Sequence, residues 1–85
     1  MATARRTTKV LRFAVVLEWD EEGQGWAVTV PALPGCLTQG DTKAEALRNA
    51  EEAIAGHLRA LEKVGRPWAG TARVEVAEVA VASTR

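Results

Sequence analysis

The sequence predicts an α+β fold: a single domain in the order β-β-β-α-β, with one long helix packed on a small, mainly antiparallel sheet. Two runs of alternating apolar residues flank an acidic, glycine-rich turn, which is the pattern of a β-hairpin. A later run carries apolar residues at helical spacing between a capping signal and a glycine. A valine-rich run, Ala72 to Ala82, predicts the last strand. Eighty-five residues leave room for one domain only.

The first strand is predicted over residues 11–18, because apolar residues alternate there with smaller or charged ones. Its apolar face is formed by Leu11, Phe13, Val15 and Leu17. Trp19 then enters the turn at residues 20–25. The second strand is predicted over residues 26–30, and its apolar face is formed by Trp26, Val28 and Val30. A short third strand is expected over residues 36–39.

A rigid turn is predicted between the second and third strands. Pro31 and Pro34 lack an amide donor and fix their own φ, so this run is not a central strand. Gly35 and Gly40 supply positions where φ can be positive. Cys36 is expected to pack beneath the turn as a small apolar residue.

The helix is predicted to begin at Thr42 and to end near Val64. Thr42 and Glu45 have the spacing of a capping box, and Asp41 adds negative charge beside the helix N-terminus. Gly65 is the expected C-terminal cap. The apolar stripe that faces the sheet is predicted to consist of Ala44, Leu47, Ala50 or Glu51, Ile54, Leu58 and Leu61.

The last predicted strand changes its period. Val74 and Val76 point to one face, whereas Val79 and Val81 fall on the opposite one. Such a break indicates either a bulge or a strand that changes partners. We expect Val79 and Val81 to contact a second copy in a homodimer or a higher homo-oligomer, since a strand that runs past its own sheet can pair with another subunit.

The run VPALPGCLTQGDTKAEALRNAEEAI resembles the signature of the HicB-like antitoxin family, with V-P, L-P-G-C, T-x-G-D-T and E-A-x-x-N-A-x-E-A in order. Its defining positions are Pro31, Pro34, Gly35, Cys36, Gly40, Asp41, Thr42 and Glu45. The likeness extends over roughly residues 10 to 65 and implies a truncated RNase H-like fold. It also implies a short-form antitoxin of a type II toxin–antitoxin pair. Such a protein binds a HicA-like mRNA-cleaving toxin and sterically masks its catalytic face.

The likeness also sets the expected organisation of the chain. Residues 1–9 are predicted to form a flexible basic tail, residues 10–82 the HicB-like domain and residues 83–85 a C-terminal tail. Longer members append a helix-turn-helix or ribbon-helix-helix domain. Because this chain ends soon after the helix, we expect no such domain, and DNA binding is not expected without it.

Composition restricts the class of the protein and its cellular location. Eleven basic residues balance eleven acidic ones, which argues against a general nucleic-acid binder. The single cysteine excludes an internal disulfide and fits a reducing compartment. Neither a signal peptide nor a membrane span is apparent, so a cytoplasmic location is expected.

The predicted toxin-binding residues combine an acidic hairpin with two tryptophans. Carboxylates at the hairpin suit a basic, RNA-binding partner, and tryptophan is enriched at interface hot spots. These residues are Glu18, Trp19, Asp20, Glu21, Glu22 and Trp68. The plainer interpretation of the acidic run is a solvated turn.

No catalytic residue, metal ligand or cofactor is predicted, and the chain is not expected to be an enzyme. Two-metal cleavage needs several converging carboxylates, and Asp41 and Glu45 are already explained by helix capping. Cys36 has no neighbouring base, and His57 has no acid partner. Two alternatives remain: a stand-alone homo-oligomeric scaffold or ligand-binding domain and, less favoured, a degenerate RNase H-like nuclease.

Overall fold

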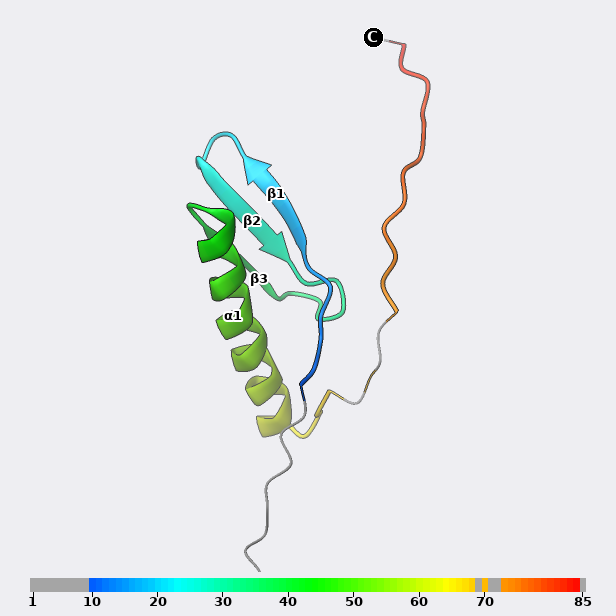
Figure 1. The fold of residues 1–85 in the computed structure, drawn as a ribbon. Coiled ribbons are helices and arrows are strands. Elements are labelled where there is room, and N and C mark those ends of the chain that lie inside the picture. Colours follow the sequence, from blue (N-terminus) through cyan, green and yellow to red (C-terminus); the bar gives the residue numbers. More distant parts are fainter. Residues whose placement is uncertain (1–9, 69, 71–72, 85) are drawn as a thin grey trace, which may run out of the picture.

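The computed structural model describes residues 10–68, 70 and 73–84. Three strands, β1 (Val16–Asp20), β2 (Gly25–Thr29) and β3 (Leu37–Gly40), form an antiparallel sheet in the order β1-β2-β3. Helix α1 (Lys43–Lys63) follows and packs on one face of the sheet, over β3 and β2 (Figure 1). The predicted α+β class and the β-β-β-α order are confirmed.

Strand β1 begins and ends later than predicted. Val16 pairs with Thr29, the last residue of β2, after which the chain turns away at Pro31. Residues 11–15 therefore lie beyond the end of β2 and have no residue of that strand to pair with. At the other end Trp19 pairs with Trp26, so the prediction that Trp19 enters the turn is wrong.

The turn between β2 and β3 has the predicted rigid form. Gly35 has a φ of 86°, and the Val30 and Cys36 backbones are linked by an N–H to carbonyl hydrogen bond of 3.1 Å. Cys36 is 6% exposed and lies with Val30 and Leu33 in one of two core clusters. Cys36 therefore packs beneath the turn, as the sequence predicted.

Gly40 has a different role from the predicted one. It is not among the described residues with positive φ. A Cβ at this position would instead lie against the backbone nitrogen of Ala46, 2.7 Å from its Cα and 2.9 Å from the carbonyl carbon of Glu45. Glycine is needed here because α1 starts in direct contact with the end of β3.

Both ends of α1 are capped by the predicted residues. The Glu45 amide donates to Thr42 Oγ1 at 3.1 Å, and the Glu45 carboxylate accepts from the Asp41 amide at 3.0 Å. At the other end, Gly65 has a φ of 74° and closes a Schellman motif. These local signals placed both helix ends to within a residue.

The face that α1 buries is only partly the predicted one. Ala46 and Ala50 are buried, whereas Ala44 is exposed and Leu47 is 46% exposed. The prediction is therefore wrong for Ala44 and Leu47 and confirmed for Ala50, because the close approach at Gly40 admits only small side chains there. The second half is confirmed by the side chains that pack on the Cys36 cluster, namely Ile54, Leu58 and Leu61.

The last predicted strand is not confirmed. Residues 73–84 form no strand pairing within the described part of the chain, and all of them except Val74 are exposed. Figure 1 shows this segment running clear of the sheet and helix. The valines of opposite parity explain the result, since a single continuous strand cannot bury both pairs on one surface. Ala72 and the predicted tail at residues 1–9 lie outside the described residues.

Candidate functional site

The end of β1 and the turn that follows bring five of the predicted site residues together. Glu18, Asp20, Glu21 and Glu22 are all exposed there. The Asp20 carboxylate accepts from the Glu22 amide at 3.1 Å, which holds the turn. The indole N–H of Trp19 donates to the Glu21 carboxylate at 2.9 Å. Four carboxylates thus project from one short hairpin, and two of them also fix its shape.

A pair of tryptophans lies on the helix side of the same hairpin. Trp19 and Trp26 are cross-strand partners whose ring centroids are 5.4 Å apart at an edge-to-face angle of 65°. Lys43, at the start of α1, places its Nζ 4.8 Å from the centre of the Trp26 ring. Trp19 remains 44% exposed, so a partner can reach it. The sequence predicted Trp26 on the apolar face of the second strand, and only the strand register reveals its pairing with Trp19.

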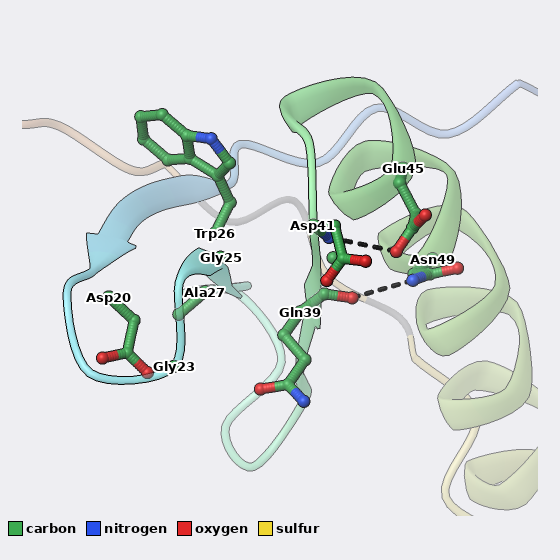
Figure 2. A pocket seen from close by; sticks show the side chains of 10 residues that line it. Asp20, Gly23, Gly25, Trp26, Ala27, Gln39, Asp41, Glu45 and Asn49 are labelled. Carbon is green, nitrogen blue, oxygen red and sulfur yellow. Dashed lines mark hydrogen bonds between the residues drawn. The ribbon is translucent and has the colours of Figure 1, made fainter.

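A hollow of about 390 Å³ separates the hairpin from the turn between β3 and α1 (Figure 2). Asp20 lines it from the hairpin, and Asp41 and Glu45 line it from the helix start. The Asn49 amide donates to the Gln39 carbonyl at 2.8 Å and joins α1 to β3 along its wall. Carboxylates on both sides suit the hollow to a protruding cationic side chain.

Trp68 does not lie with the hairpin. Its ring is 4.9 Å from that of Phe13 at an angle of 49°, and it packs against the Cys36 cluster. It is half-buried and, with Arg12, Ala32 and Val74, lines a small hollow of about 150 Å³. The predicted toxin-binding residues therefore fall into two separate places.

Asp41, Glu45 and Cys36, three described residues that bear reactive groups, have structural roles. Asp41 and Glu45 take part in the cap of α1. Burial raises the pKa of the Cys36 thiol, which keeps it protonated. Across residues 10–68, 70 and 73–84, no three acidic, histidine or cysteine side chains are grouped to hold a metal ion. Over the same residues, no helix is long and apolar enough to cross a membrane.

Comparison with known proteins gives a consistent result. Residues 13–81 match the family described as "HicB_like antitoxin of bacterial toxin-antitoxin system". A UPF0150 protein of Thermoplasma acidophilum is 49% identical over 53 residues, which cover 62% of this chain and 75% of that protein. Antitoxin HicB 1 of Photorhabdus laumondii is 50% identical over 46 residues, or 54% of this chain.

That match spans only 29% of the Photorhabdus antitoxin, so this chain corresponds to less than a third of its length. Among solved structures, the N-terminal domain of the Burkholderia pseudomallei antitoxin HicB is similar, with a TM-score of 0.65 and 34% identity. The similarity covers 73% of this chain and 72% of that domain.

Proposed function

Because the chain belongs to the HicB-like antitoxin family, we propose that it binds and sterically neutralises a HicA-like, mRNA-cleaving toxin. The match over residues 13–81, almost the whole of the described fold, is the observation that carries this proposal. Neutralisation of this kind needs no chemistry from the antitoxin. It needs a surface that competes with RNA for the toxin.

The acidic hairpin is the surface we assign to the toxin. A protein that binds RNA presents cationic side chains to phosphates, and exposed carboxylates attract the same side chains. Glu18, Asp20, Glu21 and Glu22 supply these charges, and Trp19 adds an aromatic contact beside them. The hollow lined by Asp20 and Asp41 gives one cationic side chain a place to insert. Trp68, half-buried against Phe13, remains a separate prediction of a partner contact.

The proposal also concerns the oligomeric state, the cellular location and the fold. We infer a homodimer or higher homo-oligomer formed through Val79 and Val81, which are 86% and 83% exposed. Large exposed apolar side chains of this kind favour an interface. We also infer a cytoplasmic location and a truncated RNase H-like fold.

The test is co-expression with the product of the adjacent reading frame, the position in which we expect the toxin. We expect the two proteins to co-purify and growth to be rescued from the toxin. Replacing Glu18, Glu21 and Glu22 with glutamine keeps the hydrogen-bonding shape and removes three charges. Binding should then weaken about tenfold, and its salt dependence should fall.

A matched control removes three exposed carboxylates elsewhere, in the variant E52Q/E62Q/E75Q. It should bind the toxin like the wild type. Equal weakening by both variants would show that net charge, and not the hairpin, sets affinity. If the neighbour neither co-purifies nor is neutralised, the antitoxin proposal fails and a stand-alone homo-oligomeric domain replaces it.

A further inference from the structure

The β1 side of the molecule has an unfilled apolar groove. Helix α1 covers β3 and β2, and β1 forms one of the two edges of the sheet. Between the helix flank and the segment leading into β1 lies a groove of about 540 Å³. The larger apolar side chains that line it are Leu11, Phe13, Val15, Leu47, Ile54 and Leu58. Within the described part of the chain, Glu51 is the one charged residue that lines it, so the groove suits an apolar occupant.

The residues at the mouth of this groove remain exposed to solvent. Leu11 is 50% exposed and Leu47 is 46% exposed. Strand β1, which continues from this segment, also has an unpaired edge: within the described residues, it pairs only with β2. An edge strand with a free row of amides and carbonyls accepts an added strand. A strand placed there would direct alternate side chains toward the groove.

The C-terminal arm, residues 73–84, has the properties of such a strand. It is extended, and Val76, Val79 and Val81 are each between 83% and 87% exposed. Val74, in contrast, is half-buried beside Phe13 and Trp68 of its own chain. Since Val79 and Val81 have the opposite parity to Val74, they need a second surface.

We propose that the C-terminal arm of a second copy adds along the free edge of β1 and inserts Val79 and Val81 into this groove. Val74 remains packed beside Phe13 and Trp68 of its own chain. The residues that follow it run away from the sheet and helix, as Figure 1 shows, and can reach a second copy. Each chain carries one arm and one groove, so a reciprocal exchange closes a two-fold dimer. Arg12, exposed on the edge segment, offers a cation to Glu78 of the arriving arm.

The inference rests on the homo-oligomer part of the proposed function and is independent of the toxin. Its test compares the mass of four full-length proteins in solution, by size-exclusion chromatography with light scattering. The arm variant is V79S/V81S, and the groove variant is L11S/L47S. The control is L37S/V64S, which removes two side chains of 68% and 67% exposure that line neither the groove nor the arm.

We expect the wild type and the control to have twice the 9.1 kDa mass of the chain. The arm and groove variants should be monomers, with dissociation constants raised at least tenfold. Circular dichroism checks that all four remain folded, which is expected because every substituted side chain is substantially exposed. A wild type that stays monomeric at all concentrations would overturn the proposal. Equal dissociation of the control would also overturn it.

Mixing the arm variant with the groove variant tests the pairing itself. The groove variant keeps an intact arm and the arm variant keeps an intact groove, so the mixture can form one of the two arm–groove contacts. Native mass spectrometry should therefore detect a heterodimer, whereas each variant alone stays monomeric. Absence of that heterodimer, with the wild type dimeric, would place the interface elsewhere and refute the assignment. Toxin co-purification is scored separately, so failure of the dimer and failure of the antitoxin role are distinguishable.

Discussion

Replacing Gly40 with alanine should destabilise the fold, although alanine is the smallest possible change. The new methyl carbon would lie 2.7 Å from the Cα of Ala46 and 2.9 Å from the carbonyl carbon of Glu45. Unbonded carbon atoms prefer separations of about 3.5–4.0 Å. Both neighbours are backbone atoms of the first turn of α1, so no side chain can rotate away. The helix itself must move from β3.

The magnitude follows from two opposing effects. Overpacking a tight contact costs about 1–3 kcal/mol. Replacing glycine also lowers the conformational entropy of the unfolded chain, which stabilises the fold by about 0.4–1 kcal/mol. This gain applies because the φ of Gly40 is not in the positive range, so alanine can adopt it. A net loss of about 1–2 kcal/mol is therefore expected. In a domain of this size such a loss lowers Tm by about 5–15 °C.

Thermal and urea unfolding followed by circular dichroism measure this change. Gly56→Ala is the matched control, since its added Cβ would meet only the end of the Arg59 side chain, at 3.9 Å. Gly56 lies inside α1, so alanine there should raise stability by about 0.5–1 kcal/mol. The same chemical change thus has opposite signs at two positions. If G40A is as stable as the wild type, the claimed contact between β3 and α1 is refuted.

Other perturbations test the helix cap, the buried thiol and the separation of the two surfaces. Thr42→Ala should lower the free energy of unfolding by about 1 kcal/mol in urea titrations, whereas Thr42→Ser should keep most of it. Burial raises the pKa of the Cys36 thiol above its ordinary 9.0, so this group stabilises the fold fully below that pH. Its contribution is lost as the pH rises toward the folded-state pKa, and Cys36→Ala should abolish that part of the pH dependence of unfolding. In calorimetry, V79S/V81S should bind the toxin as tightly per chain as the wild type, because the arm and the acidic hairpin share no residues.

The parts of the fold that were predicted correctly depend on local signals. Thr42 with Glu45, and Gly65 at the other end, fix the helix within a few residues of sequence. The Pro-Gly turn is likewise set by residues that restrict their own backbone. The clustering of the hairpin carboxylates was predictable for a similar reason, since residues 18–22 are contiguous and must stay close in any fold.

The parts that were not predicted depend on distances between elements. Whether residues 11–15 join a strand is decided by where β2 ends, at Thr29. Which helix face is buried is decided by how closely α1 approaches Gly40. Because of this contact, Ala46 is buried and not Ala44, which the sequence had predicted. The contact of Lys43 with Trp26 joins two elements and has no signal in the spacing of either.

The size of the domain links its thin core to the proposed dimer. Among the described residues, six hydrophobic side chains are buried, and two of these are alanines. Burying Val79 and Val81 from both arms would contribute about 6–12 kcal/mol, at about 1.5–3 kcal/mol for each valine. Association itself costs about 4–15 kcal/mol. Because these terms are similar in size, the dimer should form with moderate affinity and dissociate on dilution. Tm should then rise with protein concentration for the wild type, because association of folded chains stabilises the folded state by mass action. It should stay constant for V79S/V81S, which is expected not to associate.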